Sequence, residues 1–175
     1  MARNYRSMSL PNDTIDEVLE KLWKLETCDE GESANTFFGK RDYTNFFPTS
    51  SALEDTAREL LKFYNLHTFV GLPGEDSFYV KFSSGPEGKT LAFTEAEGDP
   101  KDDDFALLGI EVTDRFLDPN LTRYKSLLRV FIHEIVHAIC MSARLSHVDN
   151  GQHKEDFQRV RIQLERITGV DLSPH

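Results

Sequence analysis

The sequence predicts an α+β fold in which a small, mostly antiparallel sheet packs on a long helix that is followed by a C-terminal helix. Three observations predict it: helical periodicity near the N-terminus, strand-like runs between residues 68 and 112, and a long apolar helical stretch from about 120 to 143. With 175 residues, the chain is long enough for one domain with a real core. We therefore expect a flexible lead over residues 1–11 and a single domain over residues 12–175.

The N-terminal part of the domain is expected to contain two amphipathic helices. The first is predicted to be capped by Asn12 or Asp13 and to end near Leu25, because its apolar residues recur with the helical period. The second is predicted to begin near Ser51, where Ser51-Ala52-Leu53-Glu54 has the form of a capping box. Residues 26–50 show no clear period between the two helices.

The middle of the chain changes from helical to strand-like periodicity. Short β-branched and aromatic runs are separated by turns that contain glycine, proline and serine. These runs predict strands at residues 68–70, 78–82, 90–94 and 107–112, with an acidic loop at 95–104. Together they predict a sheet of three or four strands.

The long apolar helix carries the sequence His133-Glu134-Ile135-Val136-His137, an H-E-x-x-H motif. Residues four apart lie on one helix face, so both imidazoles can reach a single Zn²⁺ ion, while Glu134 can act as general base. The flanking residues are apolar, and burying two histidines and a glutamate without partners would cost several kcal/mol. A bound metal ion removes that cost, which favours a metal site over structural histidines.

A catalytic zinc ion usually has three protein ligands and one position for water. His153 is the preferred third ligand, because it follows a glycine-containing loop and precedes the last predicted helix, at about residues 154–167. His147 and Glu155 are the alternatives. The metzincin pattern is disfavoured, because Ala143 stands where its third histidine is required.

Two segments together resemble the SprT-like zinc metallopeptidases, the group that includes Spartan. They are His133-Glu134-Ile135-Val136-His137-Ala138 and, after a loop, Gly151-Gln152-His153-Lys154-Glu155-Asp156-Phe157. The resemblance extends to Ile167-Thr168-Gly169 and covers about the C-terminal 70 residues. It implies a zincin fold in which His133, His137 and His153 bind zinc and Glu134 is the general base. The sequence departs from the family at Lys154, where glycine is usual, and it has no cysteine pairs of a zinc ribbon.

These features predict a zinc-dependent hydrolase, foremost a metallopeptidase that cleaves a protein or peptide substrate with a zinc-activated water and Glu134 as general base. A zinc enzyme for a small non-peptide substrate and a non-catalytic, zinc-stabilised interaction module are the alternatives. Candidate donors to the oxyanion are Tyr124, Arg144 and His147. The strand at 107–112 is expected to hold the substrate by strand addition.

Charge and composition limit the partners. The net charge of −10 disfavours nucleic acid, and we interpret the cluster Arg159, Arg161 and Arg166 as a solvated helix face. No segment has the length of a membrane span or the form of a secretory signal, which predicts an intracellular protein without membrane contact. The two cysteines, Cys28 and Cys140, form no C-x-x-C pair, and Cys140 is expected to be a buried thiol. The oligomeric state is left open.

Overall fold

The computed structural model describes residues 14–27, 50–63, 72–74, 76–83, 92–113, 123–146, 148–149 and 151–172. Its helices are α1 (Ile15–Thr27), α3 (Ser50–Phe63), α5 (Arg123–Ser142) and α6 (Glu155–Thr168). Its strands are β1 (Tyr79–Ser83), β2 (Ala92–Glu97), β3 (Ala106–Thr113), β4 (Val148–Asp149) and β5 (Gln152–His153). The predicted lead at 1–11 and the predicted strand at 68–70 lie outside the described residues.

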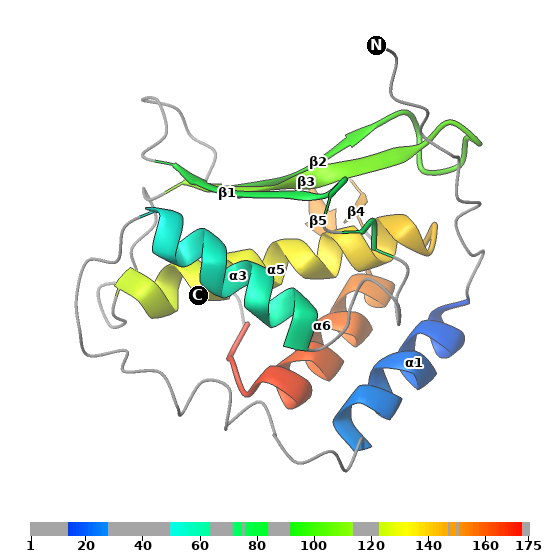
Figure 1. Ribbon diagram of the computed structural model, residues 1–175. Coiled ribbons are helices and arrows are strands. Elements are labelled where there is room, and N and C mark those ends of the chain that lie inside the picture. Colours follow the sequence, from blue (N-terminus) through cyan, green and yellow to red (C-terminus); the bar gives the residue numbers. More distant parts are fainter. Residues whose placement is uncertain are drawn as a thin grey trace.

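Helix α5 lies at the centre of the fold, between the sheet and α6 (Figure 1). Helix α3 packs beside α5 under β1, and α1 packs against α6 on the far side from the sheet. The α+β class, the small sheet packed on the motif helix and the following C-terminal helix are thus confirmed. Two of the three described strand pairs are antiparallel, β2 with β3 and β4 with β5, which agrees with a mostly antiparallel arrangement.

Strand β3 is the middle strand of the three-stranded sheet, whose order is β1-β3-β2. It pairs in parallel with β1 and antiparallel with β2, so that Ile110 lies between Val80 and Thr94. The prediction that residues 107–112 form an edge for substrate is therefore wrong, because both sides of β3 are already hydrogen-bonded. Among the described strands, β1 and β2 lie at the edges of this sheet.

Side chains of α3 occupy the outer edge of β1. The guanidinium Nη2 of Arg58 donates to the carbonyl oxygen of Val80 at 3.2 Å, and the backbone N–H of Phe82 donates to Oε1 of Glu54 at 3.0 Å. Glu54, which the sequence placed in a capping box, thus binds the sheet. Because these polar groups of β1 have partners in α3, the edge of β2 is the one better suited to strand addition.

The first helix is capped by Thr14, which follows the predicted caps Asn12 and Asp13 in the sequence and forms a capping box with Glu17. The backbone N–H of Thr14 donates to Oε2 of Glu17 at 2.6 Å, and the N–H of Glu17 donates to Oγ1 of Thr14 at 3.3 Å. This reciprocal pair satisfies the first free N–H groups of α1 and replaces the predicted caps, Asn12 and Asp13, which lie outside the described residues. At the other end of the chain, α6 ends at Gly169, whose φ of 68° suits glycine.

The core is built around α5, most of whose described side chains are buried against the sheet and α6. From this helix the core receives Phe131, Ile132, Ile135, Val136, Ala138, Ile139 and Cys140. The side chain of Cys140 is a buried free thiol, as predicted, and burial raises its pKa to about 12. In the part of the chain that the structure describes, no helix is long and apolar enough to cross a membrane.

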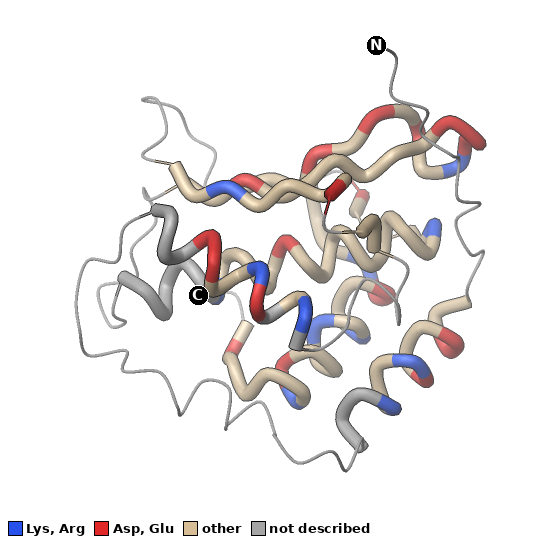
Figure 2. The backbone as a smooth tube through the Cα atoms, viewed as in Figure 1, with Lys and Arg blue, Asp and Glu red and all other residues tan. Residues whose placement is uncertain are grey.

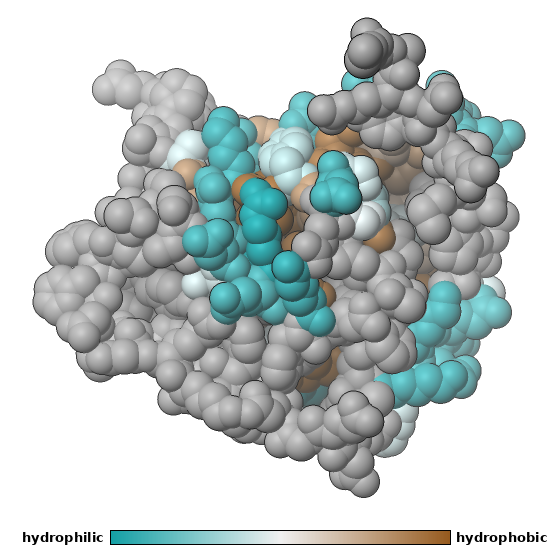
Figure 3. All heavy atoms as spheres, in the orientation of Figure 1, coloured by the Kyte–Doolittle hydropathy of each residue, from teal (hydrophilic) through white to brown (hydrophobic). Residues whose placement is uncertain are grey.

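Charged side chains lie mainly on the outside of the fold. Acidic residues gather at the end of β2 and in the loop at 98–104 (Figure 2), and hydrophilic residues cover the described part of α3 that faces the viewer (Figure 3). On α6, Arg159 forms an ion pair of 2.7 Å with Asp16 of α1, and Arg161 forms one of 2.7 Å with Glu165. These two arginines therefore belong to helix–helix and intrahelical pairs, which agrees with a helix face rather than a basic binding patch.

Candidate metal centre

Helix α5 presents His133 and His137 on the same face, one turn apart. Their ring centroids are 5.2 Å apart, and both side chains are half-buried. The helix is fixed by its buried apolar residues on the neighbouring faces, so the positions of the two imidazoles follow from the spacing of the motif. This half of the centre is what the H-E-x-x-H pattern predicts.

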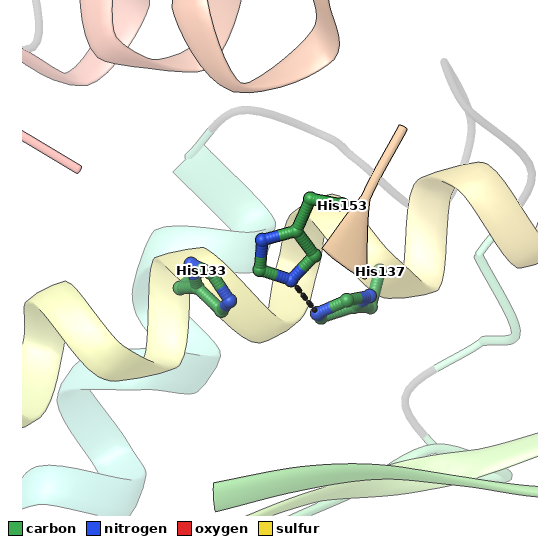
Figure 4. A group of neighbouring side chains, drawn as sticks. All are labelled: His133, His137 and His153. Atoms are coloured by element: carbon green, nitrogen blue, oxygen red, sulfur yellow. Dashed lines mark hydrogen bonds between the residues drawn. The ribbon is translucent and has the colours of Figure 1, made fainter. Parts of the chain in front are cut away.

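His153 reaches the same place from the hairpin β4–β5. Val148 pairs with His153 and Asp149 pairs with Gln152, and Gly151 in the turn has a φ of 77°, a left-handed conformation that suits glycine. The hairpin turns the exposed imidazole of His153 toward α5, where its Nε2 lies 3.2 Å from Nε2 of His137 (Figure 4).

The three histidines together have the dimensions of a metal site. One ring nitrogen of each lies within 4.8 Å of those of the others. Two nitrogen ligands of a tetrahedral Zn²⁺ ion, each bound at about 2.0–2.1 Å, lie about 3.3 Å apart, which is close to the observed separation of His137 and His153. Three imidazoles are also ligands that zinc accepts readily. The residues therefore fit a zinc ion, although the same donors suit several transition metals.

The structure tests one of the two alternatives for the third ligand, Glu155, and does not describe the other, His147. Glu155 is the first residue of α6, is exposed, and is not part of the group that comes together. His147 lies outside the described residues. Among those that are described, the group consists of three histidines, the number typical of a catalytic rather than a structural zinc site.

Phe157 forms a floor beneath all three imidazoles. Its ring is stacked on that of His153, with centroids 3.8 Å apart and an interplanar angle of 6°. The centroids of His133 and His137 lie 5.1 and 4.6 Å from it. Phe157 is 0% exposed and belongs to the core, so the first turn of α6 connects the packing of the domain to the orientation of the histidines.

Burial keeps His133 neutral in the absence of metal. The pKa of its imidazole is lowered to about 4, first by desolvation and then by the positive charges of His153, Arg129 and Arg161. A neutral imidazole is the form that binds a metal ion, because the ligand nitrogen must carry its lone pair.

Glu134 lies on the sheet side of α5 and is 7% exposed. Oγ1 of Thr94, in β2, lies 2.8 Å from Oε2 of this carboxylate and 3.0 Å from its main-chain oxygen. Burial raises the pKa of Glu134, and the hydrogen bonds from Thr94 oppose that rise. A carboxylate with a raised pKa beside a metal site is suited to accept a proton.

Lys154 ties the base of the hairpin together. Its Nζ donates to Oγ of Ser146 at 2.9 Å and lies 3.7 Å from Oδ2 of Asp149. These contacts join both ends of the segment that carries His153. The residue that departs from the pattern of the SprT-like family thus has a structural role of its own in this chain.

Of the three predicted oxyanion donors, the structure describes the side chain of Arg144 alone, and this side chain contacts the acidic loop. The guanidinium of Arg144 donates to the carbonyl oxygens of Lys101 and Asp102, at 3.5 and 3.4 Å, and so holds the acidic loop. The side chain of Tyr124 and all of His147 lie outside the described part of the chain.

The sequence interpretation assigned no role to Thr94 or Phe157 and did not predict the hairpin β4–β5, although Phe157 belongs to the segment that resembles the SprT-like family. Thr94 has no local signal, because its partner lies 40 residues away. The role of Phe157 follows from stacking that only the folded chain creates. The hairpin β4–β5 had a signal, since Asn150-Gly151 is a favoured two-residue turn.

Comparison of the chain with protein-family models, with curated proteins and with solved structures gives no match.

Proposed function

We propose that the protein is a zinc-dependent hydrolase of the H-E-x-x-H type, a metallopeptidase similar to the SprT-like family. The observation that carries the proposal is the convergence of His133, His137 and His153 within 4.8 Å, with a buried glutamate next to the first of them. Two of these histidines and the glutamate come from one helix, whereas the third comes from a hairpin sixteen residues further along. Convergence from separate elements is not expected of histidines that serve only the packing of a helix.

The roles follow from the chemistry of the side chains. His133, His137 and His153 would hold the ion through three neutral imidazoles. A zinc ion bound there would polarise a water molecule and lower its pKa toward neutrality. Glu134 would accept a proton from the attacking water and deliver it to the nitrogen of the leaving amine.

The position of β2 supports a peptide substrate. Strand β2 is the edge strand that packs on α5, and Thr94 places it directly against Glu134. An extended peptide that pairs with the outer edge of β2 would run beside the histidines, with its backbone held by the strand. In the proposed enzyme, β2 takes the substrate-binding role that the sequence assigned to residues 107–112.

The decisive experiment replaces Glu134 by glutamine. Removal of a general base typically lowers the rate by about 10²–10⁴-fold, so Glu134→Gln should abolish measurable cleavage of an unfolded protein such as casein. Elemental analysis should show the same zinc content as in the wild type, because the three imidazoles are untouched.

Glu155→Gln is the matched control. Glu155 is an exposed glutamate beside the third histidine, yet it is outside the cluster, so this variant should keep both activity and zinc. A Glu134→Gln protein that cleaves casein as fast as the wild type would refute the proposal. Loss of zinc in Glu155→Gln would instead reassign the third ligand.

A further inference from the structure

Thr94 occupies a position where the sheet meets the motif helix. It lies in β2 opposite Ile110 of β3, on the face of the sheet that packs on α5. From there its hydroxyl contacts a single residue of α5 twice, at the carboxylate Oε2 and at the main-chain oxygen of Glu134. Thr94 is half-buried, and the exposed residues of β2, which are Phe93, Glu95 and Glu97, alternate with it and point to the opposite face.

We propose that Thr94 is a positioning residue for Glu134. The hydroxyl has one proton to donate, and the carboxylate Oε2 and the main-chain oxygen of Glu134 are both acceptors, so these two oxygens share that proton. The Thr94 hydroxyl thereby holds the carboxylate through its oxygen Oε2. The catalytic consequence rests on the proposed function, whereas the contact between Thr94 and Glu134 does not.

The burial of Glu134 explains why such a partner matters. A carboxylate that is 7% exposed has little contact with solvent water, and a polar group in such surroundings needs a hydrogen bond from the protein. Without Thr94, the side chain would be free to turn to another rotamer in search of a donor. A displacement of about 1 Å in a catalytic group can lower a rate by about a hundredfold.

The same contact fixes β2 relative to α5. The edge strand proposed to hold the substrate and the glutamate proposed to take the proton are joined through one side chain. The distance between bound peptide and base would therefore be set by Thr94.

The test compares Thr94→Val, which removes the hydroxyl and keeps the shape, with Thr94→Ser, which keeps the hydroxyl. In the zinc-loaded protein, Thr94→Val should lower kcat for casein-derived peptides by about tenfold to a hundredfold, with KM and zinc content little changed. Thr94→Ser should recover most of the lost rate. Thr113→Val is the matched control, because it removes a buried threonine hydroxyl from the same sheet, at the far end of β3, and should leave kcat unchanged.

A second measurement needs neither zinc nor activity. In the metal-free protein, the effects of Thr94→Val and Glu134→Ala on the unfolding midpoint should be non-additive, because each variant removes the same side-chain hydrogen bond. After Glu134→Ala the hydroxyl can still donate its proton to the main-chain oxygen, so the coupling energy of the cycle measures how much the carboxylate contact adds to that bond.

The outcomes separate the two proposals. Additive effects in the cycle, or a Thr94→Val protein with the kcat of the wild type, would overturn the role of Thr94. A wild type without peptidase activity would overturn the proposed function, and the cycle alone would then decide whether Thr94 holds Glu134.

Discussion

The two halves of the candidate metal centre are built in opposite ways. His133 and His137 are half-buried on a helix whose neighbouring residues form the core of the domain. His153 is exposed on a hairpin of two short strands, joined at its base by Lys154. The first half is positioned by packing, and the second is positioned by a turn, a few polar contacts and one aromatic ring.

This difference gives the proposed metal ion a structural task as well. A ligand that binds only the folded state stabilises the arrangement that it joins, by an amount that grows with its affinity. Since α5 is already held by the core, the added stability should appear mainly in the hairpin. Phe157 is the residue that the two halves share, because its ring lies against all three imidazoles.

The largest effect is therefore expected for Phe157→Ala. Truncation of a fully buried phenylalanine typically lowers the free energy of unfolding by about 3–5 kcal/mol, and here it would also remove the floor of the site. Urea denaturation without metal measures the first effect, and a zinc-competition titration with a chelator measures the second. Phe93→Ala, at a phenylalanine that is 38% exposed, is the control and should change both values little. Unchanged zinc affinity in a folded Phe157→Ala protein would show that the stacking does not orient the histidines.

The second-largest effect concerns the loss of single histidines, one from α5 and one from the hairpin β4–β5. His137→Ala and His153→Ala should each lower zinc affinity by more than about a hundredfold, because loss of a ligand exceeds the 10–100-fold cost of losing an outer partner. In the metal-free protein, His153→Ala should lower the free energy of unfolding by about 0.5–1.5 kcal/mol, because it removes the stacking of an exposed imidazole on Phe157.

Gln152→Ala serves as the control for the hairpin, since Gln152 is the exposed neighbour of His153 in β5. This variant should leave zinc affinity unchanged. Equal zinc affinity in His153→Ala and the wild type would remove His153 from the site and leave α5 as its only described contributor.

The same contrast explains what the sequence could predict. The H-E-x-x-H motif, its helix and the following helix depend on residues four or fewer positions apart, and local periodicity reveals them. The choice of His153 as the proposed third ligand rested on the loop before it and the helix after it. The resemblance to a known family pointed to the same histidine. The parallel pairing of β1 with β3 and the contact of Thr94 with Glu134 join residues 30 and 40 positions apart, as in Tyr79 with Gly109. Such contacts depend on the whole fold, so no local sequence pattern predicts them.

Gly109 illustrates how a residue without functional signal can set long-range structure. A Cβ atom at this position would lie 2.4 Å from the backbone oxygen of Tyr79 and 2.5 Å from its ring. Because glycine stands there, the ring of Tyr79 can cross β3, and its hydroxyl donates a hydrogen bond to Glu95 of β2. The order of the sheet, and with it the edge position of β2, is supported by this crossing on the face away from α5.

The smallest predicted effect is a pH dependence of the stability of the metal-free protein. It depends on His133 and so concerns only the half of the centre that lies on α5. Burial lowers the pKa of His133 to about 4, whereas the imidazole of an unfolded chain titrates near 6.5. Between these values the unfolded state binds a proton that the folded state does not, so the stability of the metal-free protein rises with pH and is lost as the pH falls from about 6.5 toward 4. The partial exposure of His133 limits the size of this loss.

Urea unfolding in the presence of a chelator, repeated over this interval of pH, measures the slope. His133→Asn should show a shallower dependence than the wild type, because it lacks the group that titrates. The raised pKa of Glu134 acts in the opposite direction, but this residue is present in both proteins and its contribution cancels in the difference. Equal slopes would mean that burial does not keep the α5 half neutral, and the two halves of the centre would then differ in position but not in readiness to bind a metal ion.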